Sequence, residues 1–421
     1  MNSLSLLLPA AGFGVATALA TWLLVGQLIR LAPRIGLLDR PNERSSHTRV
    51  TPRGGGIGFV VAISLAVALY AAVAGGRWTV DGGQWTEDGG RLPVTGGRRT
   101  VDGSQLPVTG GQLAVDGGRS AVDEGGADEL IAAVLPTGTT SATILQPSAI
   151  LAVLAAALFI AAISLRDDFR SLGAGLRFAC HFAAAGAVVW ALGAFARLGV
   201  PLAGEYPLGT VAGTGLTLLW IVGLTNVYNF MDGIDGIAGV QGVAAGLGWA
   251  VAGACLGAPT AALLGVVLAG GCAGFLVHNW SPAKIFMGDV GSAFLGFLFA
   301  VVPLVAVREA PEFAARWPVF AVLAVWPFVG DGFLTFVRRL LKREKVWEAH
   351  RSHLYQRLVL TGWKHRLVSE LYAGWAAAMA AVGWLWLTAA RGSAALAPVA
   401  ALATLGGLFL FVSRRERVRR D

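Results

Sequence analysis

Long apolar runs, separated by short polar segments, constrain the fold of this chain more than any other feature of its sequence. Each run approaches the roughly 20 residues that an α-helix needs to cross a bilayer core of about 30 Å. Only 14% of the residues are charged, whereas soluble proteins have about 25%. The sequence therefore predicts an all-α, polytopic membrane protein with about eleven transmembrane helices. They are expected at about 5–29, 55–74, 148–165, 178–195, 208–225, 237–255, 259–277, 291–307, 317–337, 367–388 and 394–412.

The basic residues predict how these helices are oriented. No lysine or arginine precedes the first run, and Arg30 follows it directly, so we expect the N-terminus outside and the C-terminus in the cytoplasm. With this orientation, 24 of the 33 lysine and arginine residues lie in inner segments. The net charge of +8 then reflects basic cytoplasmic loops and does not call for a nucleic-acid partner.

One insertion interrupts the alternation of apolar and polar segments. Within residues 75–147, LPVTGG recurs at Leu92 and Leu106, and VDG recurs at Val101 and Val115. The insertion is rich in glycine and poor in large apolar residues, a composition that favours disorder. We predict one membrane domain over 1–421 with a low-complexity, disordered periplasmic insertion at 75–147.

The segment from Asn226 to Val240, NVYNFMDGIDGIAGV, places polar groups between two apolar runs. Asn226, Asn229, Asp232 and Asp235 follow one another at three-residue steps, which keeps neighbours on one side of a helix. Asn, Asp and Gly are also turn formers, so a plain connection between helices is the alternative.

Other carboxylates fall on the same predicted face. Asp167 and Asp168 follow the third run, and Asp289 precedes the eighth, five residues after Lys284. Mg²⁺ takes oxygen ligands and typically uses one or two carboxylates plus substrate phosphates, while a lysine can contact phosphate as a point charge. A solvated acidic pair and a helix cap are the simpler alternatives, but several carboxylates on one face favour a metal- and phosphate-binding site.

The histidines divide into three groups. His350 and His353 flank Arg351 without a third zinc ligand at suitable spacing, so contact with a phosphate or nucleotide fits better. His181 lies inside an apolar run, where we expect a hydrogen bond between helices. His47, His278 and His365 are interpreted as ordinary polar loop residues, and Cys180, Cys255 and Cys272 as small core residues without disulfide or metal spacing.

Four segments, in order, carry a resemblance to a known family. LRDDFR, NVYNFMDGIDG, IFMGDVGSAFLGF and HRSHLYQRL, interleaved with the apolar runs, resemble the polyprenyl-phosphate N-acetylhexosamine-1-phosphate transferases of glycosyltransferase family 4. The resemblance covers nearly the whole chain except about 75–147. It implies that a lipid phosphate, usually undecaprenyl phosphate, attacks the β-phosphorus of a UDP-N-acetylhexosamine such as UDP-GlcNAc. The products would be a sugar-diphospho-lipid and UMP.

The resemblance also implies roles for individual residues. Asp289 and Asp168 would bind Mg²⁺, with Mn²⁺ as an alternative, and Asp167 and Asp168 would be the catalytic pair. A strong general base is hardly needed, because a phosphate monoester with a second pKa of about 6 is mostly ionised at pH 7. The substrate-binding residues would be Asn226, Asn229, Asp232, Asp235, Lys284, His350, Arg351 and His353, with the histidine loop closing over the sugar nucleotide.

Differences from the family pattern indicate which branch of the family the chain resembles. Ser171 stands where the peptidoglycan-type members carry the lysine of a DDxxK pattern, whereas HRSHLYQRL resembles the branch serving O-antigen and related surface glycans. PRGGG, from Pro52 to Gly56, matches the family's Pro-x-x-Gly-Gly only loosely and receives no role. We expect an enzyme of the bacterial inner membrane that faces the cytoplasm and initiates lipopolysaccharide or cell-wall glycan synthesis. A homodimer is the candidate assembly. A secondary transporter is the alternative, and it predicts inverted repeats and polar groups near the midplane.

Overall fold

The computed structural model describes residues 4–39, 50–91, 145–345, 350–388 and 395–420, with side chains described from Ala10 onward and, in the second helix, up to Ala74. The prediction of a disordered insertion falls mainly on residues outside these ranges and stays a prediction. The elements are α1 (Leu4–Ile35), β1 (Leu38–Asp39), β2 (Thr51–Pro52), α2 (Gly55–Arg91), α4 (Pro147–Phe169), α5 (Ala174–Leu192), β3 (Arg197–Val200), β4 (Gly204–Pro207), α6 (Gly209–Met231), α7 (Ile237–Cys255), α8 (Pro259–Asn279), α9 (Gly288–Glu309), η2 (Pro311–Phe313), α10 (Trp317–Ala324), α11 (Trp326–Leu341), α12 (Leu354–Leu360), α13 (His365–Thr388) and α14 (Leu396–Arg420).

The prediction of an all-α membrane protein is confirmed. Within the described residues, 10 helices are long and apolar enough to cross a membrane, and 11 if the bent pair α10 and α11 counts as one span. The span expected at 317–337 is in fact two helices that meet at 80°. Pro327, in the first turn of α11, lacks the N–H that would continue a straight helix through this point.

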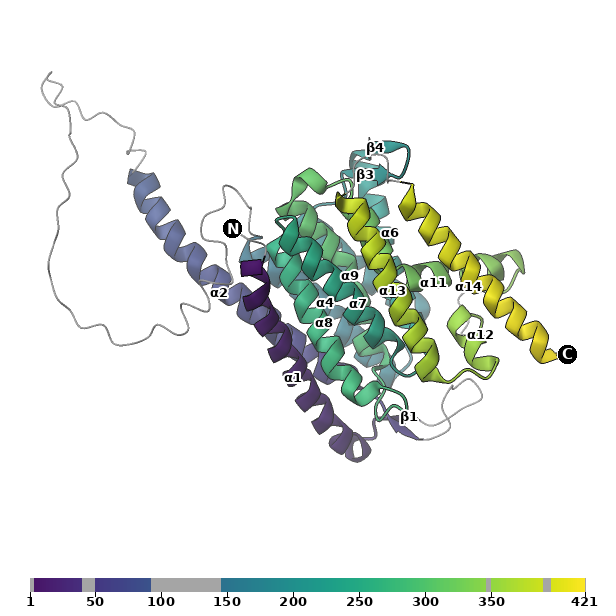
Figure 1. Ribbon diagram of the computed structural model, residues 1–421. Helices are drawn as coiled ribbons and strands as arrows, with labels where there is room; N and C mark the ends of the chain where they lie inside the picture. Colours follow the sequence, from purple (N-terminus) through teal and green to yellow (C-terminus); the bar gives the residue numbers. More distant parts are fainter. Residues whose placement is uncertain (1–3, 40–49, 92–144, 346–349, 389–394, 421) are drawn as a thin grey trace, which may run out of the picture.

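The bundle is built around α9. In its most apolar part 94% of the residues are buried, against 17% in α14 and 22% in α1, and Figure 1 shows these two helices at opposite sides of the bundle. Small residues let neighbouring helices approach closely. A Cβ atom at Gly274 of α8 would collide with the backbone of Ala18 in α1, and one at Gly56 of α2 with the backbone of Gly291 in α9.

The helices reach further than the apolar runs at the end where the polar motifs lie. α4 continues through Asp168, α6 continues through Asn229, and α9 already includes Asp289. Several contacts join these helix ends: Gly236 donates its N–H to Asn279 Oδ1 at 2.9 Å, and Phe286 donates to the Pro52 carbonyl at 2.9 Å. The motifs therefore meet at one end of the bundle, near β1, whereas the β3–β4 hairpin lies at the other (Figure 1).

A candidate active site at one end of the bundle

A cavity of about 350 Å³ opens among these helix ends. Five carboxylates line it, contributed by β1, by α4, by the α6–α7 connection and by α9: Asp39, Asp168, Asp232, Asp235 and Asp289. Arg53, Asn229, Asn279, Ser292, Gln356 and His365 add further polar groups. Residues from Asp39 to His365 therefore converge on one pocket.

Asp168 and Asp289 face each other across the contact between α4 and α9. Gly288 makes this approach possible: its φ is +72°, and a Cβ atom there would lie 3.2 Å from Asp168 Oδ2. The Asp168 carboxylate accepts a hydrogen bond from the Val290 N–H in the first turn of α9, where a helix favours negative charge. The two carboxylates are close enough for their charges to repel each other.

Asn229 connects α6 to this pair. Its Nδ2 donates to Ser292 Oγ at 3.0 Å, its side chain also hydrogen-bonds Asp289, and Ser292 Oγ donates to the Gly288 carbonyl at 3.1 Å. The amide thus fixes the carboxylate of Asp289 against the start of α9.

The two carboxylates of the α6–α7 connection have opposite electrostatic surroundings. Burial, together with repulsion by Asp289 and then Asp235, raises the pKa of Asp232 to about 7. Burial alone also raises the pKa of Asp235, but hydrogen bonds and attraction from His365 and hydrogen bonds from Ser281 and Ala283 outweigh it, so the net pKa is lowered. Asp235 thus has a nearby compensating group in His365, whereas the negative charge around Asp232 is not neutralised by cationic side chains of the cavity.

The excess of negative charge in the cavity raises the question of whether its residues can bind a metal ion. Among the described residues, no three His, Cys, Asp or Glu side chains are clustered as a preformed metal site. Mg²⁺ does not require one, because it commonly binds one or two carboxylates and completes its shell with water and substrate phosphate. Asp168 and Asp289, with Asp232 nearby, have the right chemistry and the unneutralised charge, so the residue set fits Mg²⁺.

Asp167 points away from the cavity although it is adjacent to Asp168. Its Oδ2 lies 2.8 Å from Arg177 Nη1, and its Oδ1 accepts the N–H of Leu172. It is not among the residues that line the cavity, although its charge still acts on Asp289. The structure therefore separates the two members of the expected catalytic pair.

Two of the expected substrate-binding residues also lie outside the cavity lining. Asn226 Nδ2 lies 3.0 Å from His181 Nδ1 and donates to the Val222 carbonyl at 2.7 Å. The predicted helix–helix hydrogen bond of His181 is thereby confirmed, and Asn226 is its partner. Lys284 has an exposed side chain and does not line the cavity.

The histidine segment borders a different cavity. His350 and His353 line an apolar hollow of about 490 Å³ between α6 and α11, and Arg351 lies half-buried between them. Burial, together with the neighbouring His353 and Arg339, lowers the pKa of His350 to about 4. Only Gln356, three residues after His353, reaches the carboxylate cavity.

Sequence reasoning missed other members of the site. Arg53 Nη2 donates to the Asp168 carbonyl at 2.6 Å, and Gly55 and Gly56 donate their N–H groups to the carbonyls of Phe286 and Met287. The Arg-Gly-Gly-Gly run in PRGGG is the sequence feature that could have indicated these residues. The interpretation of His365 as an ordinary loop residue is wrong: it lines the cavity, with its Nδ1 3.4 Å from Asp235 Oδ1.

Asp39 and Asn279 had no motif to indicate them, yet both line the cavity. Of the other two histidines interpreted as loop residues, His278 lies in the last turn of α8 with its Nε2 3.0 Å from the Trp22 carbonyl, and His47 is outside the described residues.

The chain is similar in sequence to several known proteins. Residues 150–307, which contain the carboxylates contributed by α4, α9 and the α6–α7 connection, match the family model for glycosyl transferase family 4. The decaprenyl-phosphate N-acetylglucosaminephosphotransferase of Mycobacterium leprae is 29% identical over 389 residues, covering 86% of this chain and 80% of the relative. A probable undecaprenyl-phosphate N-acetylglucosaminyl 1-phosphate transferase of Bacillus subtilis is 26% identical over 354 residues, covering 83% and 77%. A phospho-N-acetylmuramoyl-pentapeptide-transferase of Synechococcus is 33% identical over 193 residues, covering 45% and 54%. The segment that contains most of these carboxylates therefore matches glycosyl transferase family 4, and it lies in a chain with 10 or 11 candidate membrane-spanning helices among the described residues.

Proposed function

We propose that this protein transfers an N-acetylhexosamine 1-phosphate from a UDP-sugar to undecaprenyl phosphate in the presence of Mg²⁺ and releases UMP. The observation that carries the proposal is the convergence of five carboxylates on one cavity at the helix ends. The relatives from Mycobacterium leprae and Bacillus subtilis are named for N-acetylglucosamine and a polyprenyl phosphate, so UDP-GlcNAc is the first donor to test. The product would begin a lipid-linked surface glycan.

The reaction brings two anions together, so positioning and neutralisation of charge matter more than proton transfer. When bound, Mg²⁺ would neutralise the phosphates of the donor, and Asp168 and Asp289 would hold it. Arg53 lines the cavity beside Asp168 and can attract a phosphate group. Asn229 keeps Asp289 in place, and the ion pair of Asp235 with His365 fixes the α6–α7 connection.

Asp167 takes a structural role in this proposal. Its bonds to Arg177 and to the Leu172 N–H hold the connection between α4 and α5. The lipid phosphate is mostly ionised at neutral pH and needs no strong base.

We also propose that the cavity faces the cytoplasm, because the inner segments defined by the positive-inside rule surround it. The position of the carboxylates at the helix ends favours a transferase over the transporter alternative, which places its binding groups near the midplane.

The proposal is tested by incubating purified protein with Mg²⁺, undecaprenyl phosphate and a panel of UDP-N-acetylhexosamines, and measuring UMP release. We expect release with one donor, and none with EDTA or with Asp289→Ala. Absence of UMP with every donor would overturn the proposal, and uptake of a labelled UDP-sugar into proteoliposomes would then support the transporter.

A further inference from the structure

Asp331 is a buried carboxylate that the proposed reaction does not use. It lies in α11, its relative exposure is 0%, and it lines neither of the two cavities. An ionisable group inside a membrane-spanning segment is costly and usually serves a function. Its partners show which part of the molecule it serves.

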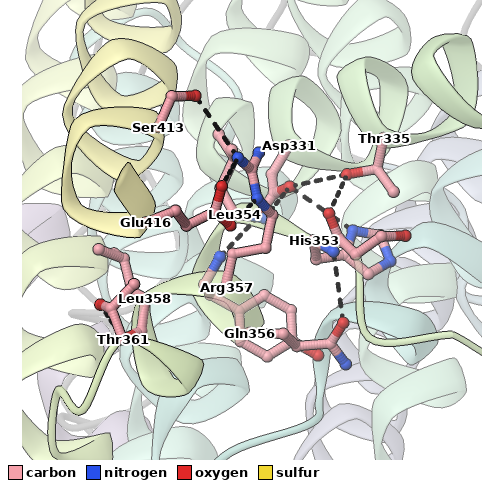
Figure 2. Close-up of polar contacts among 12 residues, drawn as sticks. Asp331, Thr335, His353, Leu354, Gln356, Arg357, Leu358, Thr361, Ser413 and Glu416 are labelled. Carbon is pink, nitrogen blue, oxygen red and sulfur yellow. Dashed lines mark hydrogen bonds and ion pairs between the residues drawn. The ribbon is translucent and has the colours of Figure 1, made fainter. Parts of the chain in front are cut away.

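The Asp331 carboxylate holds the first turn of α12. Its Oδ1 accepts the N–H of Leu354 at 2.8 Å, and its Oδ2 accepts the N–H of Tyr355 at 3.3 Å. His353 Nδ1 lies 3.6 Å from Oδ1, and Figure 2 shows His353 and Leu354 beside Asp331. Without this acceptor, two N–H groups at the start of α12 would be buried without a partner.

Two hydroxyl groups fix the carboxylate itself. Tyr372 of α13 donates to Oδ2 at 2.7 Å, and Thr335, one turn further along α11, donates to Oδ1 at 3.2 Å. Asp331 therefore joins α11, α12 and α13 at one point.

The segment that Asp331 holds borders both cavities. His353 lines the apolar cavity and Gln356 lines the carboxylate cavity, and the His353 N–H donates to Gln356 Oε1 at 3.3 Å. Between them, Tyr355 donates to the Phe230 carbonyl at 3.3 Å, and its hydroxyl fills the space that a Cβ atom on Gly233 would need. A shift of this turn would move a wall of each cavity.

The other end of α12 is fixed by α14. Arg357 donates from Nε and Nη2 to the two carboxylate oxygens of Glu416, each at 2.7 Å, and Nη2 also lies 3.4 Å from Ser413 Oγ (Figure 2). This contact holds α12 at Arg357, whereas Asp331 contacts Leu354 and Tyr355 at its first turn.

We propose that Asp331 is a positioning residue for the transfer: it fixes residues 353–356 so that Gln356 and the α6–α7 connection keep their places in the carboxylate cavity. This inference rests on the proposed function. Asp331 does not touch the cavity and acts only through the segment that it holds.

Glu309 offers a matched control. It is also a buried carboxylate, in the last turn of α9, and it accepts the N–H groups of Thr260 and Ala261 at the start of α8. Both carboxylates thus hold the first turn of a helix, but Glu309 does so at the far end of the bundle. Asp331→Asn and Glu309→Gln each replace an acceptor oxygen by a donor that faces other donors.

The experiment measures steady-state UMP release and hydrogen exchange of the purified full-length variants. We expect Asp331→Asn to lower kcat by about a hundredfold, the loss that a displacement of about 1 Å can cause, and to increase exchange at residues 353–358. Glu309→Gln should increase exchange at the start of α8 with little change in kcat. Tyr372→Phe, which keeps the carboxylate but removes one anchor, should give a smaller loss and tests the proposal even if Asp331→Asn does not fold.

Unchanged exchange at residues 353–358 in Asp331→Asn and Tyr372→Phe would overturn the proposal, as would equal losses of kcat in Asp331→Asn and Glu309→Gln. If the wild type releases no UMP, the proposed function fails, and the exchange data still decide whether Asp331 holds α12.

Discussion

Both ends of the helix bundle bury carboxylates, but the groups that surround these carboxylates differ between the two ends. At the far end Glu309 accepts N–H groups from Thr260, Ala261 and Leu145, so its oxygens are satisfied by one helix start and its surroundings. At the cavity end, Asp168 and Asp289 repel each other, and burial together with Asp289 and Asp235 raises the pKa of Asp232. A buried charge is therefore not by itself evidence of a site, whereas several charges that leave one another uncompensated indicate a bound cation or substrate.

The largest expected effect separates the two adjacent carboxylates of α4. Asp168→Asn removes a charge from the cavity and should lower kcat by about a hundred- to a thousandfold, the range for losing one electrostatic contact to a transition state. Asp167→Asn breaks a contact with Arg177 outside the cavity and should cost less than about tenfold. UMP release by folded, monodisperse protein is the measurement, and equal losses in the two variants would show that Asp167 takes part in the reaction.

The next effect is expected at Arg53, the arginine that lines the cavity with the carboxylates. Arg53→Ala should reduce kcat/KM by about ten- to a hundredfold, because a hydrogen bond to a charged group contributes about 1.5–3 kcal/mol. Arg53→Lys should recover only part of this loss, since an ammonium lacks the planar fork that reaches the Asp168 carbonyl. Initial rates at varied UDP-sugar concentration test this, and full activity of the lysine variant would show that charge alone matters.

A third effect is expected on the free energy of unfolding as the pH changes. The pKa of Asp232 in the fold is about 7 against an ordinary value of 3.8, so between these values the folded state holds a proton that the unfolded chain has released. Stability should therefore fall as the pH rises from about 4 to 7, and Asp232→Asn should flatten this dependence. Thermal unfolding without Mg²⁺ at several pH values measures it. Added Mg²⁺ should flatten the wild-type curve too, and an unchanged slope in Asp232→Asn would place the titration elsewhere.

The smallest effect is expected at the pair that fixes the C-terminal part of α12. Glu416 is 32% exposed, so solvent screens its attraction to Arg357, and Glu416→Gln should cost about 1 kcal/mol or less. We expect a slightly lower melting temperature and less than about a fivefold change in kcat. A loss as large as that of Asp331→Asn would mean that α14 positions residues 353–356 as strongly as α11 does.

Part of the site was predictable because its residues lie in compact motifs. Asn229, Asp232 and Asp289 stood out as polar groups at the ends of apolar runs, and all three line the cavity. His365 carried no comparable signal, because its partner Asp235 is 130 positions away and only the packing of α13 against α7 brings them together. The predicted histidines of HRSHLYQRL, His350 and His353, line the apolar cavity, whereas Gln356 of the same segment, which was not predicted, lines the carboxylate cavity.

The sequence by itself determined that the chain forms membrane-spanning helices and which family it resembles. Hydrophobic length and short motifs are local properties that need no knowledge of the fold. The tertiary structure alone decided that Asp168 enters the cavity while Asp167 binds Arg177, because adjacent residues point to different sides of a helix. It also decided that Asp331 supports α12, since which helix lies against a buried carboxylate depends on packing between segments that are distant in the chain.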